Sequence, residues 1–187
     1  VVSLERDPRG FLFRETTTTS AGHQTTEVWM DGGLRMLSVH QEGEMGGQPM
    51  RIDVEYDAGR ATGTARIPGA GGVQEVEVDA AVPGAVVDDN VLMALLPALP
   101  LEPGAELELP VFSAGTNTLT TYTLTVEAAD PITVPAGEFE AYRVEVTGGA
   151  APLVLHVSAG SPHRLLRLIV TGAPMELVRT GPPQSSR

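Results

Sequence analysis

The sequence predicts a mainly β protein: one strongly curved antiparallel sheet with a single short helix. About a dozen short segments alternate apolar and polar residues at spacings of roughly 8 to 12 residues. Clusters of glycine, proline and aspartate separate them, as turns require. Helical patterns do not alternate with these strands, which excludes a parallel doubly wound sheet. One stretch, residues 88–97, breaks the alternation and is predicted as the helix.

The first 80 residues contain only strand patterns. The clearest is 50–57, where Met50, Ile52, Val54 and Tyr56 alternate with charged residues and predict a half-buried strand. Asp31-Gly32-Gly33 is a strong hairpin signal, and the glycine-rich stretch 42–48 is predicted as a loop. The other strands are expected at 2–4, 11–19, 25–30, 34–39, 60–67 and 73–80.

The predicted helix has clear end signals. Asp88 or Asp89 can accept hydrogen bonds from the first turn, and Pro97 ends the helix because it has no N–H to donate. About two turns remain, too few for a helix that is stable alone. Apolar residues cover it on nearly all sides, so the helix is expected to be enclosed by the sheet or to form one wall of an apolar pocket.

The second half returns to strands, which are expected at 107–111, 118–128, 132–134, 139–147, 153–157, 165–170 and 175–178. Asp130-Pro131 is expected to separate two of them. We predict a single domain over residues 1–180 and a polar tail at 181–187. An open curved sheet needs another element to cover its open side, and we expect the apolar helix to be that element.

Composition excludes several functions. The 187-residue chain has a formal charge of −12 and no cysteine, which excludes disulfides, thiolate metal sites and cysteine nucleophiles. Its acidic residues are spread along the chain and disfavour a nucleic-acid partner. No apolar run reaches the ~18 residues of a membrane span, and no signal-peptide pattern follows Val1. We expect that an exported protein would carry its signal upstream of Val1.

The second half also resembles a known family. Leu101-Glu102-Pro103-Gly104 follows the helix, a V-P-A-G-x-F-x-A-x-x-V phrase occupies 134–144, and Ser161-Pro162-His163-Arg164-Leu165-Leu166 comes later. Over about residues 86–180 this is similar to a bacterial family of secreted domains of unknown function. The resemblance implies the half-open barrel of the periplasmic lipoprotein carriers LolA and LolB, a sheet of about eleven strands holding a helix. It implies a periplasmic or secreted location and supplies no set of catalytic residues to carry over. The phrase itself has a structural explanation: Pro135 and Gly137 form a turn, and the apolar residues after them pack.

Polar side chains show no recognisable catalytic or metal-binding motif. The histidines lack metal-ligand spacing, and the serines lie in no G-x-S-x-G turn. Carboxylates at alternate positions are typical of a solvated strand face rather than of acid/base catalysis. Asp88 and Asp89 could bind a cation, but helix capping explains them. We predict no catalytic residues, no metal and no cofactor. The residues considered are His23, His40, His156, His163, Ser113, Ser158, Ser161, Glu75, Glu77, Glu106, Glu108, Glu138 and Glu140.

The remaining candidate site is apolar. Side chains of the helix, with aromatic and methionine side chains of the strands, could line a cavity between helix and sheet that suits acyl chains. The alternative is that the same residues form an ordinary packed core. The residues are Leu92, Met93, Leu95, Leu96, Leu99, Trp29, Met36, Tyr122 and Tyr142.

Three functions remain open. The favoured one is an extracytoplasmic, non-enzymatic binding or carrier domain for a lipid, lipoprotein or other apolar ligand, opened by movement of the helix. The second is a structural or interaction module of a larger exported protein, without a ligand pocket. The third is a barrel enzyme, such as a cyclase or isomerase. A polar group with a strongly shifted pKa inside a closed barrel would favour the third.

Overall fold

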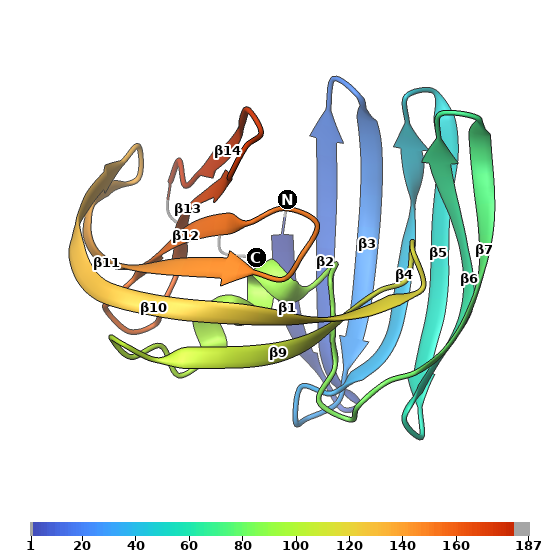
Figure 1. The fold of residues 1–187 in the computed structure, drawn as a ribbon, viewed down its shortest axis with the longest axis horizontal. Coiled ribbons are helices and arrows are strands. Elements are labelled where there is room, and N and C mark those ends of the chain that lie inside the picture. Colours follow the sequence, from blue (N-terminus) through green and yellow to red (C-terminus); the bar gives the residue numbers. More distant parts are fainter. Residues whose placement is uncertain (1, 182–187) are drawn as a thin grey trace. The chain divides into compact units, whose positions relative to one another are not determined.

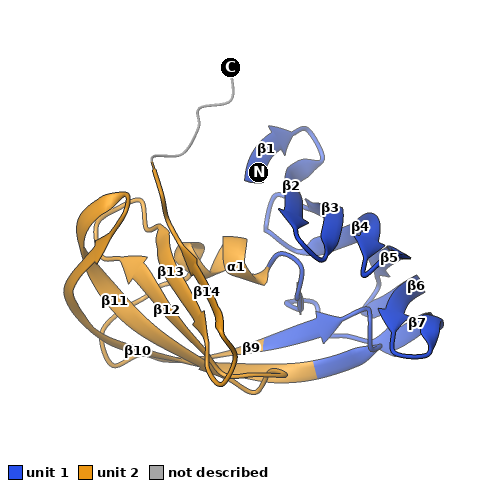
Figure 2. Ribbon diagram, turned by 90° about the horizontal axis from the view of Figure 1, so that it is seen from above, with its two compact units in different colours: residues 1–91, 110–119 blue, residues 92–109, 120–187 orange. Residues whose placement is uncertain are grey.

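A computed structural model describes residues 2–181. The chain divides into two compact units, coloured separately in Figure 2. Unit 1 comprises residues 1–91 and 110–119, and unit 2 comprises residues 92–109 and 120–187. That residues 1–180 form a single domain stays a prediction. Apart from residue 181, the predicted polar tail lies outside the described residues.

The strands of the described chain form two seven-stranded sheets, and Figure 1 labels their strands except β8. The first sheet has the order β1 (Val2–Asp7), β2 (Gly10–Thr19), β3 (Gly22–Met30), β4 (Met36–Met45), β5 (Gln48–Asp57), β6 (Arg60–Gly69), β7 (Gly72–Ala81). The second has the order β14 (Met175–Val178), β13 (Leu165–Val170), β12 (Leu153–Ser158), β11 (Gly137–Thr147), β10 (Thr118–Val134), β9 (Glu106–Ser113), β8 (Val87–Asp88).

Hairpins build the first sheet, because each of its strands pairs antiparallel with its neighbours in sequence. The β4–β5 hairpin is an example. Its two turn residues, Gly46 and Gly47, have φ angles of +60° and +75°, which suit a two-residue hairpin turn and which glycine adopts without steric cost. The hairpin predicted at Asp31-Gly32-Gly33 is confirmed. The loop predicted at 42–48 is wrong, because β4 and β5 continue up to that tight turn.

Residue alternation gives the first sheet one dry face and one charged face. Val28, Val39 and Val54 are cross-strand neighbours on the dry face and are at most 1% exposed. In unit 1, β8 contacts β4, and the Phe112 ring of β9 packs edge-on against the Tyr56 ring, with centroids 6.2 Å apart. The core of unit 1 therefore lies between the dry face and these two segments.

The second sheet is mixed, because β8 and β9 pair in parallel while β10 to β14 pair antiparallel. β10 is the longest strand, with a bulge between Val126 and Ala129. The break predicted at Asp130-Pro131 is wrong, since Pro131 stays in register with Glu140. Strands tolerate proline beside a bulge, where the regular hydrogen-bond ladder is already interrupted.

In unit 2 the V-P-A-G phrase forms the tip of the β10–β11 hairpin. Val134, Ala141 and Leu166 are buried together, and Phe139 packs against them. The tip is tied to the end of the sheet, because the Ala136 N–H donates to the carbonyl of residue 179 at 3.1 Å. That residue's N–H in turn donates to the carbonyl of residue 166 at 2.8 Å. The structural explanation of the phrase is confirmed.

The predicted helix is shorter than expected. Residues 87 and 88 are strand β8, α1 spans Leu92–Leu95, and a 3₁₀ turn, η1, spans Leu96–Ala98. Asp88 caps the turn before α1 instead of the helix, because its Oδ1 accepts the Asn90 N–H at 2.9 Å. Among the described residues, helices are too short to cross a membrane.

One part of the fold prediction is wrong: the described strands form two sheets of seven instead of one sheet of about eleven. The mainly β character and the single short helix are confirmed, and neither sheet closes into a barrel within residues 2–181. Strand periodicity reports which residues face the core, but it does not mark where one sheet ends. Here the first sheet ends at Ala81 and the second begins at Val87, and the connection between them has the same kinds of residue as the other turns.

Candidate functional site

The buried polar side chains of unit 1 gather around Asp88, which is 0% exposed. Its Oδ2 accepts a hydrogen bond from the Tyr56 hydroxyl of β5. Its Oδ1 accepts the backbone N–H of Asn90 at 2.9 Å and Asn90 Nδ2 at 2.8 Å. β8 holds the carboxylate in place because Asp88 is paired with Phe112 of β9. Each carboxylate oxygen thus has a protein donor, as buried polar groups require.

Gln41 extends these contacts to two more strands. Its Nε2 donates to Asn90 Oδ1 at 3.0 Å and to Thr26 Oγ1 at 2.9 Å. Gln41 and Thr26 are 4% and 1% exposed. We call Thr26, Gln41, Tyr56, Asp88 and Asn90 the Asp88 network. It ties the turn after β8 to β3, β4 and β5.

The carboxyl groups here have raised pKa values. Burial raises the pKa of Asp88, and its hydrogen bonds oppose only part of the shift. Burial, followed by the charge of Asp88, raises the pKa of Asp89 to about 7. Much of the Asp89 surface reaches solvent, which screens its interactions more than those of Asp88. The pKa of Tyr56 rises through burial and the neighbouring Asp88 carboxylate. The adjacent acids therefore titrate as a pair.

Shifted pKa values are typical of catalytic acids and bases, but Asp88 is closed to a substrate. It has no exposed surface, and of five surface depressions on the described residues none is lined by Asp88 or Asp89. We therefore assign the Asp88 network to structure: it anchors the turn that leads from β8 to α1.

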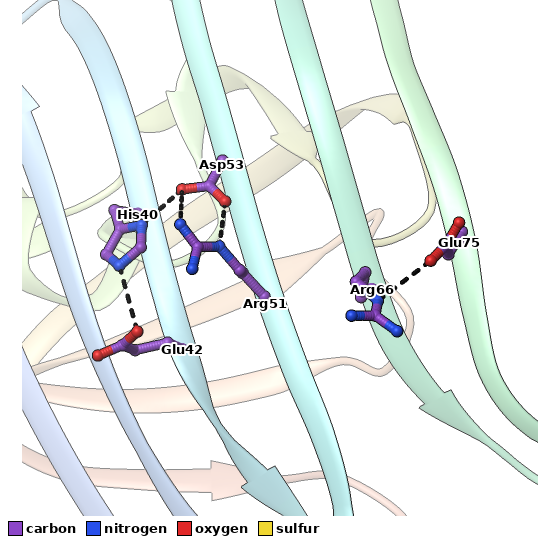
Figure 3. A network of polar contacts seen from close by, with 6 residues as sticks. All are labelled: His40, Glu42, Arg51, Asp53, Arg66 and Glu75. Atoms are coloured by element: carbon purple, nitrogen blue, oxygen red, sulfur yellow. Dashed lines mark hydrogen bonds and ion pairs between the residues drawn. The ribbon is translucent and has the colours of Figure 1, made fainter.

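The opposite face of the first sheet carries a second network, shown in Figure 3. His40 Nδ1 lies 2.6 Å from Asp53 Oδ1, and Arg51 Nε donates to Asp53 Oδ2 at 2.5 Å. His40 Nε2 is 3.7 Å from Glu42 Oε2. We call His40, Glu42, Arg51 and Asp53 the outer-face network. The hydrogen bond from Arg51 is the main reason that the pKa of Asp53 is lowered.

A shallow depression of about 410 Å³ adjoins this network. Its walls include Glu42, Arg51 and Arg66, and Arg66 pairs with Glu75 at 3.2 Å (Figure 3). Both arginines are thus held by carboxylates of the protein, and exposed pairs of this kind contribute little energy. We assign no ligand to this depression.

A second candidate site is a groove at one end of the first sheet, which we call the end groove. It consists of two adjoining depressions, of about 260 Å³ and about 500 Å³, that share Arg35, Gly84 and Val86. The β3–β4 loop, the β5–β6 turn and the connection after β7 form its walls. Most lining side chains are apolar: Leu34, Met36, Leu37, Val82, Pro83, Val86 and Val87, beside Tyr56. The charged ones are Asp31, Arg35, Asp57 and Arg60.

The β3–β4 loop fixes the rim of the end groove. Asp31 Oδ1 accepts the N–H groups of Gly33 at 2.7 Å and Arg35 at 2.9 Å, and these bonds lower the pKa of Asp31. Leu34 between them has a φ of +63°, which is uncommon for leucine, and is 38% exposed. A tightly bonded loop therefore presents an apolar side chain and a cation side by side.

The nine residues predicted to line an apolar cavity belong to both units. Leu92 and Leu96 are 2% and 1% exposed, and the other predicted members of unit 2 are half-buried: Met93, Leu95, Leu99, Tyr122 and Tyr142. In unit 1, Met36 is buried on the dry face and lines the end groove. Trp29 lies on the opposite face, with the Arg9 guanidinium 3.8 Å from its ring centroid. The nine-residue cavity stays a prediction.

The predicted polar candidates do not assemble into one site. His163 Nδ1 lies 2.7 Å from the Ser158 carbonyl oxygen. Burial, then Arg167 and Arg143, lower the pKa of His156. Ser113 hydrogen-bonds Asp89 and lowers its pKa. Within residues 2–181, no three histidine or acidic side chains come together as a metal site would require.

Comparison with known proteins identifies the family but no activity. A family model described as a protein of unknown function (DUF3108) matches residues 6–166. The chain belongs to this family. The DUF3108 match begins at residue 6, within β1, and ends at residue 166, within β13. It therefore extends further toward the N-terminus than the predicted range of about 86–180 and stops short of the end of that range. No curated protein and no solved structure matches the chain. A relationship to LolA or LolB stays a prediction.

Sequence reasoning considered Asp88 only as a helix cap or a cation ligand, and it missed Tyr56 and Gln41 of the Asp88 network as well as Arg35 of the end groove. Tyr56 was predicted on the apolar face of its strand, and its alternation with Asp57 and Glu55 is consistent with that. A tyrosine and a glutamine on dry faces signal that a buried polar partner is present, but not which one. Arg35 carried no sequence signal, because the groove beside it is built from three separate segments.

Proposed function

We propose that this DUF3108 protein is a non-enzymatic binding or carrier domain for a lipid, lipoprotein or other apolar ligand. The observation that carries the proposal is the end groove of unit 1. Its volume falls near the range of ligand pockets, and its lining is mostly apolar with a few charged groups. Met36 adds an adaptable side chain to the wall.

The preformed rim supports the same proposal. The hydrogen bonds of Asp31 hold Leu34 in a backbone conformation that leucine rarely adopts, and such conformations gather at ligand-binding sites. An apolar ligand would shield Leu34 from water without any loop having to order. That lowers the entropy cost of binding.

Two further parts of the proposal concern the type of fold and the location of the protein in the cell. A half-open barrel like that of LolA and LolB is supported within unit 2 by the hydrogen bond that ties the tip of the β10–β11 hairpin to residue 179. Action outside the cytoplasm rests on the sequence resemblance alone.

Binding of two simple probes, decanoate and 1-decanol, tests the proposal by native mass spectrometry and calorimetry on the full chain. We expect one-to-one binding of at least one probe. Leu34→Asn should weaken it about five-fold, because apolar contact area is lost while asparagine tolerates the same backbone conformation. Leu119→Asn is the matched control, since Leu119 is 41% exposed and Leu34 38%. The proposal is wrong if the unmodified protein binds neither probe.

A structural or interaction module is the second candidate, and exposed apolar residues on the two edge strands favour it. Val2 and Leu4 of β1 are 60% and 58% exposed, and Met175 and Leu177 of β14 are 51% and 56% exposed. Unpaired strand edges with apolar side chains are ready partners for another chain. Replacing Leu4 and Leu177 with lysine should leave probe binding unchanged and abolish any self-association seen by light scattering.

A further inference from the structure

We propose that the end groove is specific for a single-chain amphiphile with an anionic head group, such as a fatty acid, and that Arg35 binds the head group. This inference rests on the proposed function and adds the ligand class. It follows from the position and the bonding of Arg35, the charge balance around it, and the apolar surface that adjoins it.

Arg35 is placed to bind an anion. Within residues 2–181 its guanidinium donates no hydrogen bond to a carboxylate, whereas Arg60 of the same groove pairs with Asp79. Asp31 lies close enough for the charge of Arg35 to lower its pKa, but Asp31 Oδ1 already accepts two backbone N–H groups. The planar guanidinium of Arg35 is therefore open to a bidentate carboxylate.

The charge balance of the groove tolerates an anion. Its lining holds two arginines and two aspartates, which sum to zero, whereas the chain as a whole carries −12. Most of the protein surface thus repels an anion, and the end groove does not. The groove's exposure to solvent leaves room for water to complete the hydration of a head group.

Apolar surface adjoins Arg35 directly. Arg35 and Val86 line both depressions of the groove, and Leu34 precedes Arg35 on the rim. A carboxylate on Arg35 would therefore place its alkyl chain against Val86 and Leu34. A small inorganic anion would use only the arginine and leave this apolar contact unused.

The test compares decanoate with 1-decanol, which share an alkyl chain and differ in head charge. In the unmodified protein we expect decanoate to bind about ten-fold more tightly than the alcohol. Arg35→Gln should weaken decanoate binding by about the same factor and leave decanol binding unchanged. Arg164→Gln, at an exposed arginine of unit 2, is the control for loss of one positive charge.

The outcomes separate this inference from the proposed function. Equal affinity for acid and alcohol, or an Arg35→Gln effect that is the same on both, overturns the role of Arg35 while the binding function stands. An Arg164→Gln effect as large as that of Arg35→Gln also overturns it, because net charge alone would then explain the result. If neither probe binds, the proposed function fails and this inference fails with it. Inorganic phosphate that competes fully with decanoate would overturn the amphiphile in favour of a plain anion site.

Discussion

The two faces of the first sheet hold aspartates in opposite conditions. Asp88 on the dry side is fully buried, and burial raises its pKa. Asp53 on the outer face has a side chain that is 41% exposed, and the hydrogen bond from Arg51 lowers its pKa. Both acids have hydrogen-bond donors, so the number of partners does not explain the difference. Burial and the charge of the donors do. The donors to the buried Asp88 are neutral and return less than its carboxylate loses on leaving water, whereas Asp53 stays in contact with water and accepts from the cationic Arg51.

This contrast predicts unequal costs of mutation. A buried group that loses a hydrogen-bond partner cannot replace it with water, whereas an exposed group can. Mutations in the Asp88 network should therefore destabilise unit 1, and mutations in the outer-face network should hardly change the free energy of unfolding.

Asp88→Ala should have the largest effect. It leaves the Tyr56 hydroxyl and the Asn90 backbone N–H without an acceptor, while Asn90 Nδ2 keeps its 3.2 Å bond to Asp89 Oδ1. We expect a loss of about 3 kcal/mol in the free energy of unfolding. Asp88→Asn is the matched control: it keeps an acceptor for Asn90 and removes the buried charge, so its effect should stay within about 1 kcal/mol. Urea unfolding followed by circular dichroism measures both. Equal losses would show that the hydrogen bonds do not anchor the turn.

The pH dependence should differ between the two faces. The pKa values of Asp88 and Asp89 are raised, the latter to about 7, so the folded state holds their protons more tightly than the unfolded chain, where the aspartate pKa is about 4. Their contribution to stability is complete at low pH and is lost as the pH rises toward 7. Asp53, with a lowered pKa, contributes above pH ~4 and loses this contribution as the pH falls.

Unfolding midpoints measured from about pH 3 to pH 8 separate these contributions. Asp88→Asn should flatten the curve above about pH 4, and Asp53→Asn should change its shape only below about pH 4. If Asp88→Asn left the upper range unchanged, the raised pKa of the buried Asp88 would not contribute to the pH dependence of folding.

Gln41→Ala should cost less than Asp88→Ala. It removes the donor to Asn90 Oδ1 and to Thr26 Oγ1, and the threonine hydroxyl can rotate to find another partner. We expect a loss of about 1 to 2 kcal/mol. The double mutant with Asp88→Ala should lose less than the sum of the two, since both act on Asn90. Full additivity would mean that the network is not a single unit.

Strand periodicity predicted which face each residue of β5 occupies but not what it meets there. The alternation over 50–57 placed Tyr56 with the apolar residues and Asp53 with the charged ones, and both positions are correct. The bond from Tyr56 to Asp88, which spans 32 positions, depends on where the chain returns after β7. No local sequence pattern indicates where the chain returns.

The predicted start of the helix, at Asp88, is wrong for a related reason. Aspartate is a residue type that commonly caps helices. Sequence alone cannot distinguish a capping aspartate from a buried one that accepts a hydrogen bond from a distant tyrosine. The parallel pairing of β8 with β9 then makes Asp88 the end of a strand instead of the start of the helix. Tertiary contacts therefore decided this segment, as they often do for short ones.

The smallest effect should come from the outer-face network. His40→Ala removes the contact with Asp53, whose carboxylate keeps its bond to Arg51 and its access to water. We expect a change within about 0.5 kcal/mol, reduced further at high salt. A double-mutant cycle of His40→Ala with Asp53→Asn, read by urea unfolding in low and high salt, measures the pair directly. A coupling above about 1 kcal/mol would mean that this face is shielded from solvent in the folded protein, and the contrast with the Asp88 network would then no longer rest on exposure.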